Sequence, residues 1–217
     1  MWCGTDCVRR NVWTPMHRRD FLAKLGSLAV CGFSSGALVR ASEFCQWVGP
    51  RFSRCTVGIE EERLCFGTQQ QSSKWCWAAC IEMVFAYYGY KVSQSRIVRE
   101  TWGALLDRPV HERQLIDDLN RRWTDDSGRH FRSSADFFNE PAAGVSDLRK
   151  NRPLILGTLG HTVVLTAVTL ETDEFSGRWH IVEAAVRDPW PGRGARTLSG
   201  EEWHDARFAA RVLLHGI

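Results

Sequence analysis

The stretch "QQQSSKWCWAAC", Gln69–Cys80, decides how this chain is interpreted. Polar residues fill its first half, and two tryptophans and two cysteines fall within its last six residues. The apolar run "WAACIEMVFAYY" continues from it, broken only by Glu82 and followed by Gly89 as a stop signal. A helix that is apolar on nearly every side is central to a domain rather than peripheral. We therefore expect a loop that ends at Cys76 and a buried helix that begins there.

Cys76 stands at the predicted helix N-terminus, and that position changes what a thiol can do. A thiol attacks as the thiolate, and its pKa falls where the helix dipole and the free N–H groups favour negative charge. The N–H of Cys76 would form one half of an oxyanion hole, and Gln70 in the preceding loop is a candidate for the other half. Gln69 and Gln71 compete for that second role. The opposing interpretation is a buried structural thiol, because free cysteine is among the most buried residue types.

The composition is that of one ordinary globular domain. A chain of 217 residues with 44% hydrophobic content can bury one good core and at most two small ones. The formal charge of +3 is uneven, because residues 1–41 carry six Lys/Arg and two Asp/Glu, whereas the remaining 176 residues carry 22 and 23. A body so close to neutral has no electrostatic footprint for nucleic acid, so we expect no such partner.

The basic excess belongs to a predicted targeting segment, "MHRRDFLAKLGSLAVCGFSSGALVRAS". It begins at Met16, an alternative start of the chain, and contains the pair Arg18–Arg19. A moderately apolar stretch follows and ends in Val39–Ala41, a small-residue cleavage site. This order resembles a twin-arginine (Tat) export signal. We expect residues 1–41 to be a leader that engages the Tat translocase and to be removed after Ala41, leaving a periplasmic or secreted protein.

Other interpretations of the leader remain. An ordinary N-terminal helix is one of them. Cys31 raises a lipoprotein interpretation, although Val30 is bulkier than the residue expected before a lipid-modified cysteine. The apolar stretch is too short and too rich in Gly and Ser to span a membrane, so no stable membrane anchor is expected.

Cleavage after Ala41 would leave an odd number of cysteines in the mature chain. They are Cys45, Cys55, Cys65, Cys76 and Cys80. In an oxidising compartment four of them can form two disulfides in three connectivities, and the fifth is an intermolecular partner or a reactive thiol. Residues 42–65 are predicted to form an extended arm stapled to the core, and whether they act as a propeptide stays open.

Periodicity divides residues 66–217 into helices followed by strands. Helical spacing is found in residues 77–88, 93–102 and 111–123, and a short helix is predicted before Pro153. The segment "TDDSGRH" is predicted as a turn. Short β-branched runs then follow, "PLILG", "HTVVLTAVTL", "RWHIVEAAV" and "ARVLLH". Helices first and strands afterwards predict an α+β fold, with one helical lobe and one antiparallel sheet.

A cysteine nucleophile needs a base, and the base needs a group that orients it. His161 opens the strand run "HTVVLTAV", and Gly160 before it leaves the ring uncrowded. Asp188 in "VRDPWPG" lies at the end of the next strand, where Pro189 stops strand pairing. Adjacent antiparallel strands can bring these two side chains together. The alternatives are a histidine at the edge of the core and an aspartate that opens an Asp-Pro turn.

These three segments resemble the papain-like cysteine peptidases, and most closely the bacterial branches near the bacteriocin-leader peptidases and the plant-pathogen effector proteases. "QQSSKWCWAAC" carries the family spacing, in which Gln70 precedes Cys76 by six residues and Trp-Ala follows. "GHTVVLTAV" and "VRDPWPG" supply His161 and Asp188 in the family's order. The resemblance covers roughly residues 66–200 and implies a papain-like two-lobed α+β fold with its site between helix and sheet.

The resemblance also implies roles. Cys76 would attack the scissile carbonyl carbon, and His161 would take the thiol proton and later donate it to the leaving amine. Asp188 would fix the imidazole tautomer, while Gln70 and the Cys76 N–H would hold the oxyanion. Two departures from the family pattern are present: Trp75 replaces a small residue before the nucleophile, and position 188 holds aspartate instead of asparagine, which would favour a more charged pair with His161.

The remaining cysteine, histidines and tryptophans favour structural roles. Cys80 lies one turn further along the helix and is expected to be buried or bridged to the arm. The other histidines have no metal-ligand spacing with the cysteines, so neither zinc nor an organic cofactor is expected; they include His111, His130, His180, His204 and His215. The tryptophans are expected to pack in the interior, with Trp190 also placed to line the cleft; they include Trp75, Trp77, Trp102 and Trp190.

The leading functional hypothesis is an exported, monomeric cysteine peptidase that cleaves peptide or protein substrates. A cell-wall amidase or endopeptidase acting on peptidoglycan stem peptides is the second hypothesis, because it uses the same Cys-His logic. A papain-like binding module without catalytic activity is the third. Thiol-directed inactivation at Cys76 that depends on His161 separates the enzymes from the binding module.

Overall fold

The computed structural model describes residues 42–60, 68–206 and 208–216. The predicted signal peptide, with Cys31 and its cleavage site at Ala41, lies outside the described residues, and so does Cys65 of the predicted arm. In the described part of the chain, no helix is both long enough and apolar enough to cross a bilayer.

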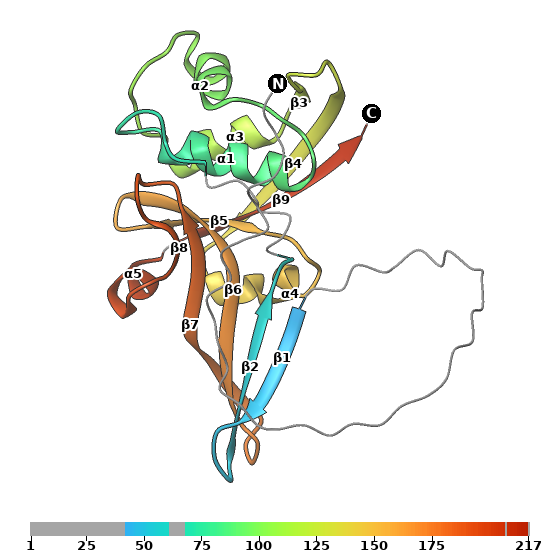
Figure 1. The fold of residues 1–217 in the computed structure, drawn as a ribbon, viewed down its shortest axis with the longest axis vertical. Helices are drawn as coiled ribbons and strands as arrows, with labels where there is room; N and C mark the ends of the chain where they lie inside the picture. Colours follow the sequence, from blue (N-terminus) through green and yellow to red (C-terminus); the bar gives the residue numbers. More distant parts are fainter. Residues whose placement is uncertain (1–41, 61–67, 207, 217) are drawn as a thin grey trace, which may run out of the picture. The chain divides into compact units, whose positions relative to one another are not determined.

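The helices lie mainly in the first half of the described chain (Figure 1). They are α1 (Cys76–Tyr87), α2 (Gln94–Trp102), α3 (Glu112–Leu119), α4 (Val145–Leu148) and α5 (Gly200–Asp205), with a 3-10 helix at Pro141–Gly144 before α4. Figure 1 shows α1, α2 and α3 gathered on one side of the strands, with α4 and α5 apart from them.

Nine strands in the described ranges form one antiparallel sheet. They are β1 (Ser42–Trp47), β2 (Phe52–Gly58), β3 (Arg122–Thr124), β4 (His130–Phe138), β5 (Leu154–Thr158), β6 (His161–Asp173), β7 (Arg178–Asp188), β8 (Gly194–Thr197) and β9 (Phe208–Gly216). Their order is β1-β2-β6-β5-β9-β4-β3, and β7 branches from β6 to pair with β8. The prediction of an α+β fold with a helical part and an antiparallel sheet is confirmed.

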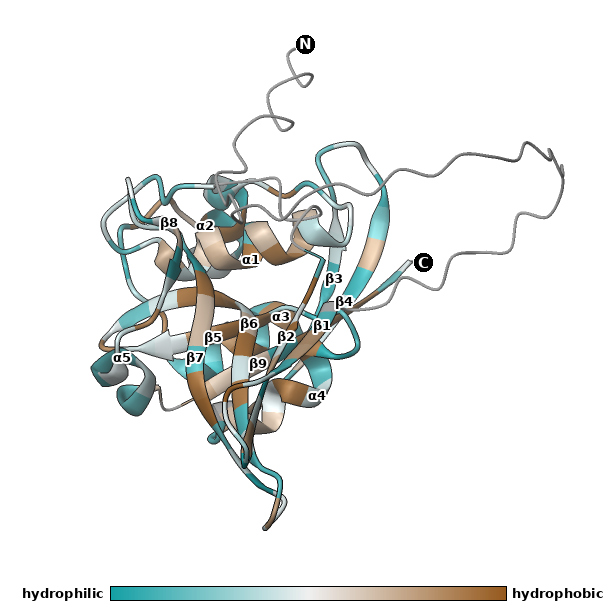
Figure 2. Ribbon diagram, turned by 60° about the horizontal axis from the view of Figure 1, so that its bottom comes forward, coloured by the Kyte–Doolittle hydropathy of each residue, from teal (hydrophilic) through white to brown (hydrophobic). Residues whose placement is uncertain are grey.

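The centre of the sheet is buried on both faces. On β5, Ile155 packs into a core shared with α1, α2 and α3, whereas Leu154 and Leu156 pack into a second core with α4. Side chains alternate between the faces of a strand, so a strand covered on both sides needs an unbroken apolar run. Figure 2 shows this contrast, because the inner strands are largely hydrophobic and α5 is hydrophilic.

Helix α1 is the central helix that its composition predicts. Nine of its 12 residues are buried, so it has no solvent-facing stripe of the usual width. Its largest side chain, Trp77, is 1% exposed, and Phe85 makes edge-to-face contacts with Trp123 and Phe131 of the sheet. The helix therefore serves as a fixed base for the residue at its N-terminus, Cys76.

The third helix is shorter than its apolar stripe predicts. It ends at Leu119, and Trp123 belongs to β3 instead of the helix. The cause is Asn120, whose side chain donates to the carbonyl of Ala135 and accepts from its N–H, both at 2.8 Å. These bonds replace the next helical turn with the start of a β3–β4 hairpin, of which only the turn was predicted. Trp123 is still buried in the core that contains α1, because its side chain points from β3 to the helical side of the sheet.

Residues 42–58 form a hairpin that extends the sheet. Cys45 and Cys55 lie directly opposite each other on β1 and β2 and are joined by a disulfide. The bridge therefore staples the predicted arm to itself, and the backbone pairing of β2 with β6 joins it to the body. Of the remaining cysteines that the structure describes, Cys76 and Cys80 are both free thiols.

A two-residue turn fixes the position of His161. Leu159 and Gly160 connect β5 to β6, and both have positive φ angles, 46° and 70°. This is the backbone of the tight hairpin turns that match strand twist, in which glycine is favoured and leucine is unusual. The N–H of Leu159 donates to Asp205 of α5 at 2.5 Å, which holds the turn in place. His161 thus follows immediately from a constrained turn.

We expect Cys80→Ser to destabilise the fold by about 1–3 kcal/mol, because the hydroxyl would be buried among apolar side chains without a partner. Cys80 has no solvent exposure and lies in the core shared by α1 and the sheet. Chemical denaturation of the serine variant measures this loss. Cys80→Ala is the control, because it removes the sulfur without adding a polar group and leaves only a small cavity. Equal stability of the serine variant and the wild type would contradict the structural role of Cys80.

Candidate active site

The loop before α1 is held from outside by a second loop. The carboxylate of Asp107 accepts hydrogen bonds from the Ser73 hydroxyl and from the Lys74 N–H, both at 2.7 Å. The indole N–H of Trp75 donates to the carbonyl of Leu106 at 2.9 Å. The indole of Trp77, two residues further on, makes the matching bond to the loop carbonyl at position 108. The two tryptophans of the opening sequence therefore fix the backbone on either side of Cys76.

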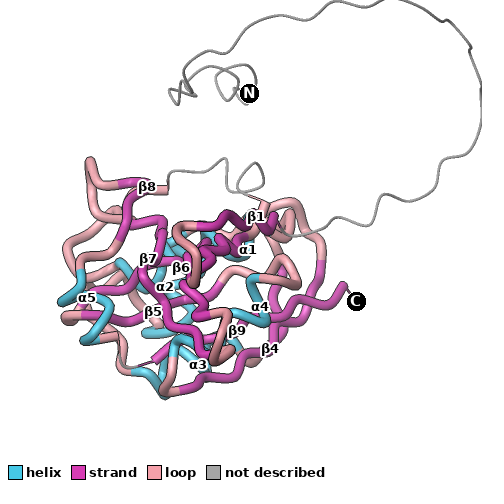
Figure 3. The backbone as a smooth tube through the Cα atoms, turned by 90° about the horizontal axis from the view of Figure 1, so that it is seen from below, coloured by secondary structure: helices cyan, strands magenta, loops and turns pink. Residues whose placement is uncertain are grey.

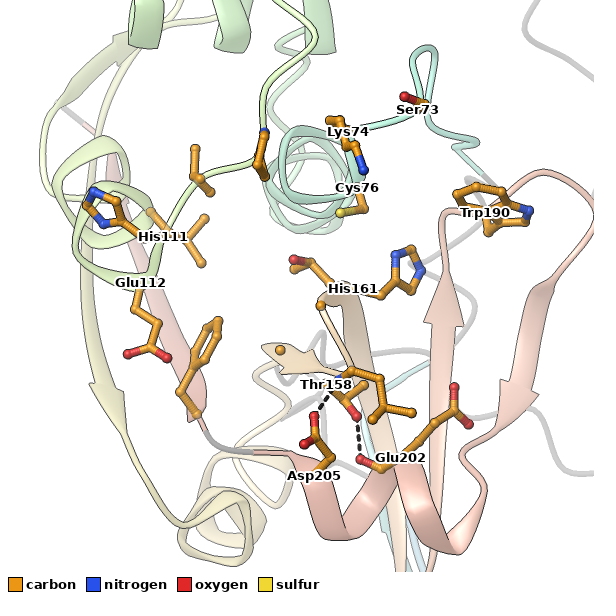
Figure 4. A pocket seen from close by; sticks show the side chains of 18 of the residues that line it. Ser73, Lys74, Cys76, His111, Glu112, Thr158, His161, Trp190, Glu202 and Asp205 are labelled. Carbon is orange, nitrogen blue, oxygen red and sulfur yellow. Dashed lines mark hydrogen bonds between the residues drawn. The ribbon is translucent and has the colours of Figure 1, made fainter.

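Cys76 is the first residue of α1 and is partly exposed. Helix geometry leaves its N–H without an intrahelical partner. The thiol faces the imidazole of His161, and hydrogen bonding with His161 and Thr162 lowers its pKa. Figure 4 shows Cys76 and His161 on facing walls of one cavity, the first on α1 and the second at the start of β6.

His161 links the thiol to a buried carboxylate. Its Nε2 lies 2.7 Å from Oδ1 of Asp188, the last residue of β7. The Asp188 side chain has no solvent exposure. With Nε2 bonded to the carboxylate, Nδ1 is the ring nitrogen left for Cys76. The structure therefore brings three of the four predicted site residues together, with His161 between the thiol and the carboxylate.

Asp188 is itself held by three further donors. The Trp190 N–H donates to Oδ1 at 2.8 Å, and Nε of Arg196 donates to Oδ2 at 2.8 Å. Arg193 approaches Oδ2 at 3.4 Å. The other side of the Arg196 guanidinium forms two bonds with Glu202 of α5, at 2.9 and 2.6 Å. Two carboxylates and two guanidinium groups thus compensate one another behind the imidazole.

The contacts lower the pKa of the Cys76 thiol and raise the pKa of the His161 imidazole, which favours an ion pair between the two groups. Burial raises the pKa of Cys76, but the hydrogen bond and charge of His161, together with the hydrogen bonds of Thr162, outweigh burial and lower the pKa overall. Burial lowers the pKa of His161, but its bonds with Asp188 and Cys76 raise the pKa to about 9. A thiolate beside an imidazolium is the protonation state in which a cysteine is a nucleophile at neutral pH.

The carboxylates behind the imidazole stay ionised. Burial alone would raise the pKa of Asp188, yet the hydrogen bonds from His161, the Trp190 N–H and Arg196 bring it well below the ordinary value. The bond from Arg196 likewise lowers the pKa of Glu202 to about 2. Around neutral pH both therefore carry their charge.

Gln70 lies beside the site but is bonded within its own loop. Its Nε2 donates to the carbonyls of Ser72 and Ser73, at 2.9 and 3.0 Å, and its Oε1 is buried without a partner in the described residues. The Gln70 N–H donates to the carbonyl of Pro189 at 2.8 Å, next to Asp188. In this structure Gln70 shapes the loop that leads to Cys76. To donate to an oxyanion, it would have to exchange one of the two side-chain bonds.

The cavity in front of the thiol has a volume of about 1200 Å³. Its walls come from the loop before α1, the start of α3, the β5–β6 turn and α5 (Figure 4). Val110, Leu115 and Phe208 give it apolar surface, and Trp190 borders it beside Cys76 and His161. The Phe208 ring fits only because position 157 is glycine, where an added Cβ would lie 2.1 Å from the ring. The cavity is large enough to take several residues of an extended chain.

Sequence reasoning missed several residues that support the site. Thr162 was not predicted, because adjacent residues of a strand normally point to opposite faces. Thr162 lies at the very start of β6, where this alternation does not keep it away from the thiol. Arg196 becomes visible only from the β7–β8 register, which places it near Asp188. Glu202 carried a readable signal, because "SGEE" at residues 199–202 has the capping-box pattern, and the box is formed.

The remaining predicted residues have the following positions. Trp75 and Trp77 are buried, whereas Trp190 is 44% exposed at the cavity edge. His111 lies at the N-cap of α3 and also lines the cavity. Among the described residues, a possible metal-ligand group consists of Glu43, Cys45 and Cys55, but both sulfurs are consumed by the disulfide.

A buried helix that begins with a cysteine, facing a histidine of an antiparallel sheet, is the arrangement of the papain-like cysteine proteases. The family model described as "Papain-like cysteine protease AvrRpt2" matches residues 58–204, more than half of the chain. The chain belongs to this family and is a cysteine protease by family. No curated protein matches it.

Solved structures with a similar fold include a double glycine motif protease from an AMS/PCAT transporter in complex with the leader peptide. That structure is 17% identical, with a TM-score of 0.43, and the match covers 83% of this chain and 96% of the other. The peptidase domain of Streptococcus ComA is 16% identical, with a TM-score of 0.46 over 69% of this chain and 97% of the other. UfSP from C. elegans is 12% identical, with a TM-score of 0.44 over 82% and 34%.

The charge arrangement behind His161 predicts opposite effects of two substitutions. Arg196→Gln removes the cation that competes with the imidazolium for Asp188, so the pKa of His161 should rise. Glu202→Gln removes the carboxylate that draws Arg196 away, so the pKa of His161 should fall. NMR titration of the His161 ring measures both without any substrate, starting from about 9 in the wild type.

Arg54→Gln is the matched control, because it removes the same charge from β2, where Arg54 pairs with Glu171. It should leave the titration of His161 unchanged. Shifts of the same sign in the Arg196 and Glu202 variants would show that the two residues act only through the packing of the loop.

Proposed function

We propose that the chain hydrolyses peptide bonds through a Cys76–His161–Asp188 triad. The observation that carries the proposal is a partly exposed helix-terminal thiol that faces His161, whose ring is hydrogen-bonded to a fully buried carboxylate. The apolar cavity in front of the thiol supports a polypeptide substrate, and membership of a cysteine protease family agrees with it.

The chemistry follows from the positions of the groups. The Cys76 thiolate attacks the scissile carbonyl carbon, and the carbonyl oxygen becomes an oxyanion beside the Cys76 N–H. The tetrahedral adduct collapses when Nδ1 of His161 gives its proton to the leaving amine, which leaves a thioester on Cys76. Neutral His161 then takes a proton from water, whose oxygen attacks the thioester. The second collapse releases the carboxylic acid product and restores the thiolate and the imidazolium.

Asp188 and Gln70 have supporting roles in this proposal. Asp188 holds Nε2, so that Nδ1 faces the thiol and the imidazolium is stabilised. Gln70 is proposed as the second oxyanion donor, released from the carbonyl of Ser72 or Ser73 when substrate enters. One such donor is typically worth on the order of 10²–10³ in rate. Gln70→Ala should therefore lower kcat more than it raises KM.

Turnover of a quenched casein substrate tests the triad. Cys76→Ala should reduce the rate to background, and His161→Ala should reduce it by on the order of 10⁴ or more, because a thiol without its base is a weak nucleophile. Both substituted side chains border the cavity instead of filling the core, so the melting temperature should change little. Cys80→Ala is the matched control and should retain turnover.

A parallel incubation with purified peptidoglycan separates the peptidase from a cell-wall amidase. Release of muropeptide fragments with casein left intact would assign the same triad to stem peptides. Full activity of Cys76→Ala would exclude the triad. Absence of turnover on both substrates, together with no preferential alkylation of Cys76, would favour a binding module.

We also propose that residues 1–41 direct export through the twin-arginine pathway and are removed after Ala41. The Cys45–Cys55 disulfide supports this location, because disulfides persist in oxidising compartments. The product would be a monomer without a membrane anchor. Intact-mass analysis of the exported protein should give a chain that begins at Ser42, and replacing Arg18 and Arg19 with Lys should abolish export. An unprocessed chain that keeps residues 1–41 would contradict the proposal.

A further inference from the structure

The strands at the far end of the sheet carry a row of cations on one face. Register places Arg122 on β3 opposite Arg132 on β4, and Arg132 in turn opposite His215 on β9. Directly opposed residues have Cβ atoms about 4.5–5.5 Å apart and share a face of the sheet. All three side chains are exposed. Figure 3 shows β4 beside β9, with which it pairs in antiparallel orientation near the C-terminus.

This row lies on the sheet face opposite to the helical part. Phe131 and Ala135, which alternate with Arg132 along β4, are buried in the core that contains α1 and α3. Because side chains alternate along a strand, Arg132 and Ser134 point to the other face. The row is therefore separate from the catalytic cavity, and the two sets of lining residues have no member in common.

Among the described residues, the charges in this row have no acidic partner, unlike other cations on the sheet. Arg54 pairs with Glu171 across the strands at 2.8 Å, and Arg211 forms two bonds with Asp147. In contrast, no carboxylate of the described residues forms an ion pair with Arg122 or Arg132. Like charges directly opposite each other destabilise a sheet. An anion bound between the two guanidinium groups would remove this repulsion.

The side chains border a shallow concave site of about 530 Å³. Its lining consists of Arg122, Arg132, Ser134, His215 and Gly216, with no acidic residue among them. Two guanidinium forks, a hydroxyl and an imidazole all offer hydrogen-bond donors to one small volume. Guanidinium forks bind phosphate and carboxylate in bidentate fashion, and a phosphoryl group offers three strong acceptor oxygens. A carboxylate has only two oxygens and would leave donors of this set unused.

We propose that this outer-face site binds a phosphomonoester group. The occupant is a single phosphoryl group on a small molecule or a side chain, because all of the donors come from neighbouring positions on three adjacent strands. The proposal does not depend on the peptidase activity. Its geometry predicts bidentate contacts from Arg122 and Arg132, with Ser134 and His215 at the edge.

Isothermal titration of the full chain with O-phosphoserine tests the site. We expect saturable binding, and Arg132→Gln should weaken it at least about tenfold, as is typical when a charge-assisted hydrogen bond is lost. Arg122→Gln should weaken binding similarly. The melting temperature of both variants should stay equal or rise, because each relieves the repulsion between the two arginines. Arg54→Gln, which removes an equal charge from β2, should leave binding unchanged.

Three comparisons can overturn the assignment. Glutamate binding as tightly as O-phosphoserine would show that the site does not select a phosphoryl group. Equal affinities of the wild type, Arg122→Gln and Arg132→Gln would show that the row is not the site. Binding to phosphatidic acid vesicles but not to O-phosphoserine or inorganic phosphate would show that the surface recognises a membrane instead of an isolated phosphoryl group.

Discussion

The contact between the Cys76 thiol and the His161 imidazole is the interaction on which the rest of the site depends. The contact joins Cys76, the first residue of α1, to His161, the first residue of β6. A shift of either starting point by one residue would break it. The two beginnings are fixed by different means. Bonds from Asp107 and the two indoles hold the backbone before α1, while a strained two-residue turn fixes the start of β6. The apolar core between them sets the spacing.

The aspartate behind the imidazole creates an electrostatic problem that the structure answers locally. An uncompensated carboxylate beside His161 would stabilise the imidazolium strongly. The imidazolium would then hold its proton so tightly that it would be a poor acid for a leaving amine. Arg196 and Arg193 compensate the charge of Asp188, and Glu202 in turn draws Arg196 away. The cluster is close to neutral overall. The cluster therefore gives the imidazole a hydrogen-bond acceptor that orients it, as an asparagine would. The pKa of His161 in this setting is about 9.

The sequence predicts the parts of the site that depend on local pattern. Cys76 could be placed because a polar loop and an apolar helix meet there, and His161 because glycine and a β-branched run bracket it. The fold class followed from the order of helices and strands. Strands β3 and β4 were missed because Asn120 ends α3 through bonds to Ala135, a partner fifteen residues away that periodicity cannot reveal. Arg196 was missed because its role depends on hairpin register.

Gln70 shows the limit of a spacing argument. The position six residues before Cys76 was identified, but spacing does not determine where an amide points. The Nε2 group faces two backbone carbonyls, and an amide turned over would set its oxygen against both of them, so this orientation is fixed by repulsion as well as by bonding. Its Oε1 is left buried without a partner in the described residues, which costs free energy. That cost would be relieved by any rearrangement that frees the amide toward the cavity.

Helix α5 shows how polar contacts contribute to positioning a site. None of its residues is fully buried, although Trp203 packs partly buried against the second core. Glu202 closes its capping box with Ser199 and also binds Arg196, while Asp205 holds the N–H of Leu159 in the turn before His161. The short helix therefore reaches the imidazole from two directions, through Asp188 and through the turn. The position of α5 therefore links the orientation of the His161 ring to the start of β6. For this reason a six-residue surface helix contributes to the geometry of the site.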